Sequence, residues 1–335
     1  MIFDIGLLIV GIIFVLVASE LFTNGIETLG HRLNVSKNFT GSVLAAVGTA
    51  LPETLIPIIA VIFFSGNKGQ DIGVGAILGA PFMLSTLAFP LIGITVLIGY
   101  LLKKRSIVLN AETTGLRRDL TFFLFAYSVA LFVVPFESHS VRIITAVFLL
   151  ILYVVYVFQT LKGESEDMEA TEHLFFAPKN PHPPMFIILS QVIVSLVLMV
   201  VGAHTFVHGV ESVSLLIGLD PLIFSLLIAP IATELPEKIN SITWVWKGKD
   251  TLAVGNVAGA MVFQSTIPVS FGIVFTDWNI TGLALVSGIF AIVSAFLVLT
   301  LSYIDRKYFA YGFSLGILFF IVYVFLVLNE NISKF

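Results

Sequence analysis

Residues 48–53 read Gly-Thr-Ala-Leu-Pro-Glu and residues 232–237 read Ala-Thr-Glu-Leu-Pro-Glu, so the chain carries nearly the same stretch twice. Each copy places a glutamate, Glu53 or Glu237, directly after a proline inside an apolar segment. A charged side chain at the centre of a membrane helix costs at least about 2.5 kcal/mol, so an acidic residue there is a functional candidate. Because proline has no N–H, we expect each helix to loosen or break one turn before its proline. Freed carbonyl oxygens and carboxylate oxygens suit a hard cation such as Ca²⁺ or Na⁺.

The composition is that of an integral membrane protein. Of the 335 residues, 58% are hydrophobic and 11% are charged, and the mean hydropathy is +1.04, which excludes an ordinary soluble domain. The chain has no cysteine, so disulfides and thiolate metal sites are excluded. The net charge of −4 is thinly spread and suggests no nucleic-acid partner. The apolar run at 6–19 follows Asp4 without a Lys or Arg, so we expect it to be retained rather than cleaved as a signal peptide.

The apolar windows predict an all-α polytopic membrane protein with ten transmembrane helices, because about 20 apolar residues cross a bilayer. They fall into two sets of five, separated by a polar segment. The windows lie at about 5–28, 39–64, 71–101, 119–136 and 140–161, and at about 185–214, 220–246, 250–275, 279–303 and 308–328.

Loop charges predict the orientation, since Lys and Arg accumulate on the cytoplasmic side. With the N-terminus outside, thirteen basic residues fall in inner loops and three in outer loops. We therefore expect both termini outside. The inner set is Arg32, Lys37, Lys103, Lys104, Arg105, Arg117, Arg118, Lys162, Lys179, Lys247, Lys249, Arg306 and Lys307, and the outer set is Lys68, Arg142 and Lys334.

The duplication extends beyond the first motif. Residues 25–27 match 209–211 at the same shift of 184 residues that separates the two Pro-Glu motifs. An odd number of spans separates the copies, so the halves should insert with opposite topology, as in many secondary transporters. The expected units are a first repeat over 1–162, a cytoplasmic acidic and Pro-rich linker over 163–184, and a second repeat over 185–335.

Residues 48–53 with 71–80, and residues 232–237 with 250–260, resemble the two alpha repeats of the sodium/calcium exchanger superfamily. The resemblance spans essentially all ten predicted helices and marks the chain as a divergent prokaryotic-type member. It implies a Ca²⁺/cation antiporter of the plasma membrane that works by alternating access. It also implies a central Ca²⁺ site built from the two repeat glutamates and the carbonyls of the preceding threonines. Carried over, these are Glu53, Glu237, Thr49 and Thr233.

The chain also departs from that family. Sodium-coupled members carry Ser after the motif Thr and Gly-Ser-Asn in the later helix, and here those positions hold Ala50, Glu234, Ala80 and Ala260. Gln264 retains an amide oxygen further along. We therefore expect an asymmetric site with fewer Na⁺ positions. Either Na⁺ or H⁺ can be the counter-ion, because a carboxylate in a low-dielectric cavity stays protonated until a cation arrives.

Two of the candidate ligands have alternatives. Glu234 lies four residues before Lys238, the spacing of a helical ion pair, so it is either a cation ligand or the partner of that lysine. A helix break at Pro236 weakens the spacing argument, and Lys238 can also act as a tethered cation in a vacant Na⁺ position. Gln264 is either a ligand or a hydrogen-bonding residue between helices.

Two further patterns are best explained without a ligand. The pair Gly75 and Gly79, and the pair Gly255 and Gly259, have the spacing of closely packed membrane helices. His204, His208 and Glu211 share one helical face and can ligate a transition metal, but an interfacial face or ion vestibule accounts for them better.

The leading function is thus a secondary active Ca²⁺/cation antiporter without a cofactor, with small inorganic cations and the lipid bilayer as partners. An antiporter for Mg²⁺, Mn²⁺ or Na⁺ against H⁺ is the alternative, followed by a channel and a non-transporting cation-binding protein. Catalytic motifs of hydrolases and nucleotide-binding loops are absent, so an enzyme is not expected. The oligomeric state is left open.

Overall fold

The computed structural model describes residues 2–33, 45–64, 66–132, 138–160, 173–180, 182–304 and 309–332. The regular elements of these residues are all helical, as predicted. Within the described residues, seven helical stretches are long and apolar enough to cross a membrane, so the chain is a multi-pass membrane protein. Helices fall on each expected window, while the count of ten spans stays a prediction. The helices are α1 (Ile2–Arg32), α3 (Ala45–Phe63), α4 (Asn67–Met83), α5 (Phe89–Leu101), α6 (Thr113–Phe132), α7 (His139–Thr160), α8 (Met185–Leu216), α9 (Pro221–Thr233), α10 (Leu235–Trp246), α11 (Asp250–Gln264), α12 (Ile267–Phe275), α13 (Gly282–Leu301) and α14 (Phe309–Ile332).

Several of the membrane segments are interrupted near their middle. A π-helical turn, η2 (Leu84–Ala88), separates α4 from α5, and a two-residue break at 265–266 separates α11 from α12. The segment with the second Pro-Glu motif breaks at Glu234, two residues before Pro236, close to the expected position. In the first repeat the expectation of a break is wrong, because α3 runs through Pro52 without interruption. One proline removes one backbone hydrogen bond, and the other helical bonds suffice to keep α3 continuous.

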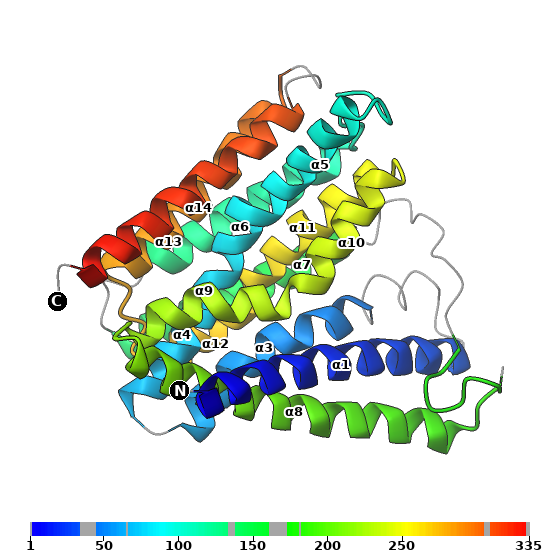
Figure 1. Cartoon of the computed structure of the whole chain (residues 1–335), viewed down its shortest axis with the longest axis vertical. Coiled ribbons are helices and arrows are strands. Elements are labelled where there is room, and N and C mark those ends of the chain that lie inside the picture. The colour runs from blue at the N-terminus through cyan, green and yellow to red at the C-terminus, as the bar shows by residue number, and fades with distance from the viewer. Residues whose placement is uncertain are drawn as a thin grey trace.

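The long helices α1 and α8 lie side by side, apart from most of the bundle (Figure 1). Glycines bring their backbones together: a Cβ on Gly11 would lie 2.5 Å from the Phe206 N, and one on Gly209 would lie 2.7 Å from the Leu8 Cα. The contacts pair early residues of α1 with late residues of α8, so the two helices run antiparallel. The largest buried core lies elsewhere, among α4 to α7 and α11 to α14, and α3 packs between it and the α1–α8 pair.

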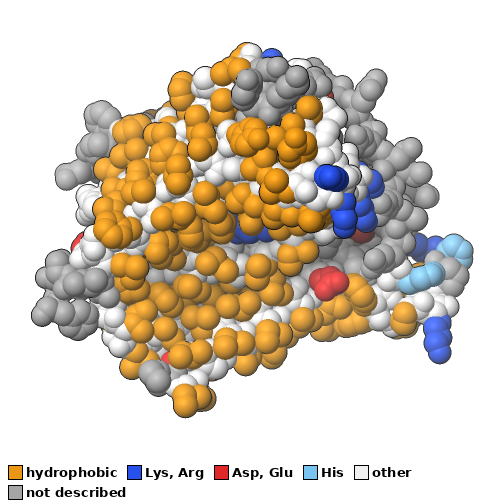
Figure 2. All heavy atoms as spheres, turned by 45° about the horizontal axis from the view of Figure 1, so that its top comes forward, with side chains coloured by type: hydrophobic (Ala, Val, Ile, Leu, Met, Phe, Trp, Pro, Cys, Tyr) orange, Lys and Arg blue, Asp and Glu red, His pale blue; other side chains and the backbone are white. Residues whose placement is uncertain are grey.

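The outer surface of the molecule suits a bilayer. Figure 2 shows hydrophobic side chains over most of one face, while most of the visible Lys and Arg side chains gather toward one end of that face. Large apolar residues of α7 and α8, such as Phe158 and Ile193, are exposed. Because α8 exposes large apolar side chains from Phe186 to Val201, this part of its outward face is best solvated by lipid.

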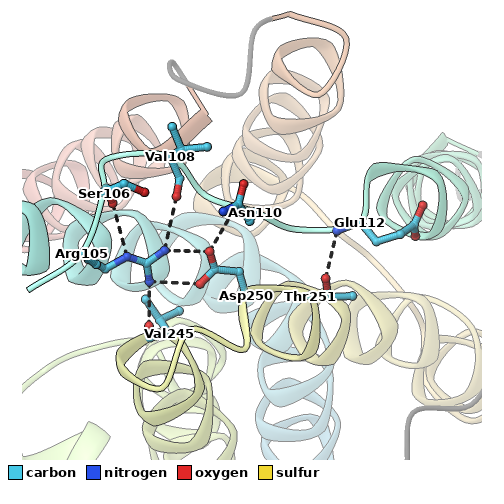
Figure 3. Close-up of polar contacts among 8 residues, drawn as sticks. All are labelled: Arg105, Ser106, Val108, Asn110, Glu112, Val245, Asp250 and Thr251. Atoms are coloured by element: carbon cyan, nitrogen blue, oxygen red, sulfur yellow. Dashed lines mark hydrogen bonds and ion pairs between the residues drawn. The ribbon is translucent and has the colours of Figure 1, made fainter.

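The connection after α5 is tied to the turn before α11 (Figure 3). Arg105 forms a two-pronged ion pair with Asp250, with Nη1–Oδ1 and Nη2–Oδ2 distances of 3.0 and 2.7 Å. Arg105 Nη1 also donates to the Val245 carbonyl at 2.6 Å, and the Asn110 N–H donates to Asp250 at 2.8 Å. This cluster joins the two halves of the chain at one end of the bundle.

We expect Asp250→Ala to lower the free energy of unfolding by about 3 kcal/mol, because it leaves the mostly buried Arg105 guanidinium without its carboxylate. The Arg105 side chain is only 14% exposed. The matched control is Glu211→Ala, which breaks the pair with Lys68, whose side chain is 51% exposed; that loss should be below about 1 kcal/mol. The measurement is the thermal unfolding midpoint of each purified variant in detergent. Equal shifts in the two variants would contradict the prediction.

The predicted linker lies partly outside the described residues, including its acidic cluster between 164 and 172. Its described end, 173–180, is held against α1 and α8. The backbone N–H of Phe175 donates to Asn24 at 3.2 Å, and that of Phe176 donates to Gln191 at 2.9 Å. Two buried amide side chains therefore fix this end of the linker to the helices.

Candidate cation-binding site

Glu53 projects from the middle of α3 into the protein rather than toward lipid. Its side chain is 7% exposed. Gln264, the last residue of α11, is 1% exposed, and its Nε2 donates a hydrogen bond to Glu53 Oε2. The structure therefore brings together a carboxylate of the first half and an amide of the second half, 211 residues apart in sequence.

Gln264 also offers an oxygen. Its Oε1 is buried and has no hydrogen-bond partner among the described residues. The end of α11 is held by the hydroxyls of Ser265 and Thr266, which donate to the Val262 carbonyl at 3.0 and 2.7 Å. A buried oxygen without a partner is unfavourable unless a donor or a cation reaches it. The amide oxygen beside the Glu53 carboxylate thus fits a hard cation.

Glu234 sits at the break between α9 and α10 and is fully buried. Its Oε2 accepts from Lys238 Nζ at 2.8 Å, and its Oε1 has no hydrogen-bond partner among the described residues. The break does not disturb the i to i+4 register, because the Lys238 N–H still bonds the Glu234 carbonyl at 3.1 Å. Of the two alternatives, the ion pair is the one that the structure contains.

Lys238 is itself buried, at 5% exposure. Its ammonium also donates to the carbonyl of Pro230 at 3.3 Å. No pattern in the sequence points to Pro230, because it contributes a backbone carbonyl rather than a side chain. The ammonium therefore bridges the Glu234 carboxylate and the last turn of α9.

The remaining predicted ligands are only partly described. Thr233 is the last residue of α9, and its hydroxyl donates to the Ala229 carbonyl at 3.1 Å, back along its own helix. Thr49 belongs to α3 and Glu237 to α10, but their side chains lie outside the described residues. Their part in a site stays a prediction.

The two glycine pairs behave differently. A Cβ on Gly75 would lie 2.2 Å from the Leu222 carbonyl oxygen, and one on Gly79 would lie 2.1 Å from that of Leu226, so the expected close packing is confirmed for the first pair, between α4 and α9. In the second pair, Gly255 is exposed and meets no described atom within 4 Å. The expectation of close packing is wrong for Gly255 in this conformation.

The histidine face does not form a metal site among the described residues. Glu211 pairs with Lys68 at 3.3 Å, and His208 Nδ1 lies 3.4 Å from the Ser212 hydroxyl. The His204 ring packs against Phe64, with centroids 5.0 Å apart. These partners favour an interfacial face over a metal site.

Three comparisons place the chain among known proteins. A family model described as sodium/calcium exchanger protein matches residues 3–162 and 187–329. The chain is 25% identical over 324 residues to the uncharacterized membrane protein MJ0091 of Methanocaldococcus jannaschii, and the match covers 97% of both chains.

Two solved structures share the fold. The crystal structure of the H⁺/Ca²⁺ exchanger CAX superposes with a TM-score of 0.67 at 17% identity, covering 98% of this chain and 89% of that one. The sodium-calcium exchanger NCX_Mj superposes with a TM-score of 0.57 at 21% identity, covering 96% and 98%. At these identities the similarity is evidence for the fold alone.

Proposed function

This chain belongs to the sodium/calcium exchanger protein family, and from that premise we propose that it is a secondary active antiporter that exchanges Ca²⁺ for Na⁺ or H⁺. The family is one of transporters rather than enzymes. One observation carries the proposal for the site: the buried Glu53 carboxylate meets the buried Gln264 amide across the two halves of the chain. A carboxylate in this position is costly unless a cation is its regular partner.

The proposed Ca²⁺ ligands are oxygens from both repeats. Glu53 and Glu237 supply carboxylates, Gln264 supplies its amide oxygen, which has no hydrogen-bond partner among the described residues, and Thr49 and Thr233 supply backbone carbonyls. Such a set of hard oxygen ligands suits Ca²⁺. Glu234 is left out of the set, because its contact with Lys238 at 2.8 Å gives it a different role.

The proposed architecture is two inverted five-helix repeats, 1–162 and 185–335, joined by the linker 163–184, with both termini outside and the site near the midplane. The antiparallel pairing of α1 with α8, the first helices of the two repeats, supports it. So does the position of helix breaks at the middle of several segments, the usual location of transporter sites. The start of α1 and the end of α14 also lie toward the same side of the molecule (Figure 1).

The two glycine pairs support the proposal of alternating access. In the proposed orientation α4 and α9 both begin outside, so the close contacts of Gly75 and Gly79 seal the outer half. Gly255 lies in the inner half of α11 and is exposed. In the proposed cycle this conformation alternates with an inverted one, in which Gly255 is closely packed and the contacts of Gly75 and Gly79 open.

The test is ⁴⁵Ca²⁺ uptake into proteoliposomes that contain the purified protein. An outward Na⁺ gradient and an outward H⁺ gradient are applied separately, with ionophores that collapse each gradient as controls. We expect uptake under one gradient, which identifies the counter-ion, because a coupled exchanger moves Ca²⁺ only against the ion it carries back. Uptake without any gradient would indicate a channel. No uptake under either gradient would overturn the Ca²⁺ assignment. Uptake of Mg²⁺ or Mn²⁺, or Na⁺/H⁺ exchange, would then indicate another antiporter. The absence of all these activities would indicate a non-transporting protein.

A further inference from the structure

We propose that Lys238 is a built-in cation: its ammonium permanently occupies the monovalent-cation position at the break between α9 and α10, so that this half of the site takes no Na⁺. The consequence for coupling rests on the proposed antiport, but the occupancy itself does not. Lys238 then does more than pair with Glu234, because its ammonium takes the place of a bound monovalent cation.

The position has the chemistry of a cation site. It offers the Glu234 carboxylate at 2.8 Å from the ammonium and the Pro230 carbonyl at 3.3 Å. Glu234 is fully buried and Lys238 is 5% exposed, so water does not satisfy these groups. Without a cation at this point, the carboxylate would be an uncompensated buried charge.

Helix geometry adds to the attraction for a cation. The ammonium sits at the C-terminal end of α9, where the carbonyls point outward and the helix dipole is negative. Pro236 has no N–H, so the carbonyl of Ala232 lacks its usual helical donor. The C-terminal ends of broken helices are where secondary transporters coordinate their monovalent ions. Lys238 therefore places a positive charge where such an ion would bind.

The first repeat has neither member of the pair. At the shift of 184 residues, Ala50 stands for Glu234 and Thr54 for Lys238. The Thr54 hydroxyl donates to the Ala50 carbonyl at 2.9 Å, so a neutral hydrogen bond replaces the ion pair. The carboxylate and the ammonium are thus present together in one repeat and absent together in the other, as expected if each requires the other.

A tethered ammonium cannot leave during a transport cycle. The charge of Glu234 is then balanced in every conformation, and no exchange of ions takes place at this position. A counter-ion must bind elsewhere, among Glu53, Gln264 and Glu237. The number of Na⁺ ions that the chain can carry is lower by one than it would be with a neutral residue at 238.

The test asks whether removing the ammonium creates a Na⁺ site. The variant is Lys238→Met, which keeps the length of the side chain and removes its charge. The matched controls are Lys238→Met with Glu234→Gln, which removes both charges, and Lys68→Met, which removes the lysine of the exposed pair. For each purified protein, the unfolding midpoint is measured without Ca²⁺ in NaCl and in choline chloride at equal ionic strength.

We expect Na⁺ to raise the midpoint of Lys238→Met in a saturable way, by on the order of 5 °C, because bound Na⁺ stabilises the folded state. Wild type and both controls should respond to Na⁺ equally, either not at all or, if Na⁺ is the counter-ion, only through the site around Glu53 and Gln264, and Lys238→Met should exceed them by this amount. A Lys238→Met protein that can be purified only in Na⁺ would likewise support the proposal. A Lys238→Met protein that is equally unstable in Na⁺ and choline, or whose response to Na⁺ is no larger than that of wild type and the controls, overturns the proposal. The measurement requires no transport, so its outcome and that of the flux assay are independent.

Discussion

Replacing Glu53 with Gln is expected to lower gradient-driven ⁴⁵Ca²⁺ uptake by more than about 100-fold. Residues that only support a metal ligand change metal affinity by about 10–100-fold when mutated, and Glu53 is proposed to bind the cation directly. Glutamine keeps the shape of the side chain but not its charge. The facing Gln264 amide can turn its Oε1 or Nε2 toward the new amide, so the contact between α3 and α11 is retained.

Stability separates loss of the site from loss of the fold. The unfolding midpoint of Glu53→Gln without Ca²⁺ should match or exceed that of wild type, because a buried carboxylate has been removed. Ca²⁺ should raise the midpoint of wild type and leave that of the variant unchanged. Glu211→Gln removes an equal charge from an exposed ion pair and serves as the matched control. Uptake by Glu53→Gln within about twofold of wild type would exclude Glu53 as a ligand. Glu237→Gln, the corresponding change in the second repeat, should give the same result as Glu53→Gln.

Much of the fold was readable from the sequence because a membrane helix leaves a strong local signal. A run of about 20 apolar residues marks each span regardless of what it packs against, and all the predicted windows contain helix. Whether the helix breaks at each proline could not be predicted from the sequence. Pro52 and Pro236 occupy matching positions, yet α3 continues through the first and the helix breaks before the second. That difference depends on tertiary context, which a single sequence does not reveal.

The sequence predicted candidate residues for the site but not which of them are in contact. The sequence identified Glu53 and Gln264 as polar residues in apolar segments, while their contact joins residues 211 apart. It left the role of Glu234 open because a helix break makes i to i+4 spacing unreliable. The structure shows that the backbone bond from Lys238 to Glu234 preserves the register and that the two side chains form an ion pair. The Arg105–Asp250 pair has no local signal at all.

The Glu234–Lys238 ion pair and the close α4–α9 packing at Gly79 both involve Pro230. A Cβ on Gly79 would lie 2.7 Å from the Pro230 Cγ, and the Pro230 carbonyl accepts from the Lys238 ammonium. α4 therefore packs on the same turn of α9 that holds the charge. Any motion that separates α4 from α9 acts directly on the environment of the Glu234–Lys238 pair. We expect this pair to remain formed while the seal opens, since its members both belong to the α9–α10 segment.

The second large effect is expected from Gly255→Leu, which should lower Ca²⁺ uptake by more than about 10-fold while leaving the unfolding midpoint unchanged or slightly higher. Gly255 is exposed in the conformation described, and an added Cβ meets no described atom within 4 Å. Replacing glycine inside a helix favours the helix by up to about 1 kcal/mol. In an inverted repeat, the opposite conformation would bring Gly255 into the kind of contact that Gly75 and Gly79 make now. A leucine would block that approach.

Gly75→Leu is the matched variant in the first repeat, and its effect on stability should be the reverse. Its Cβ would lie 2.2 Å from the Leu222 carbonyl oxygen, so it overpacks the conformation described and should destabilise it by about 3 kcal/mol. Both variants are measured by unfolding midpoint and by uptake in the same proteoliposomes. Normal uptake by Gly255→Leu would show that α11 never packs closely at this position and would argue against a second, inverted conformation. Opposite stability effects with a shared loss of transport are what alternation between two such conformations requires, because each glycine is then needed in the state where it is packed.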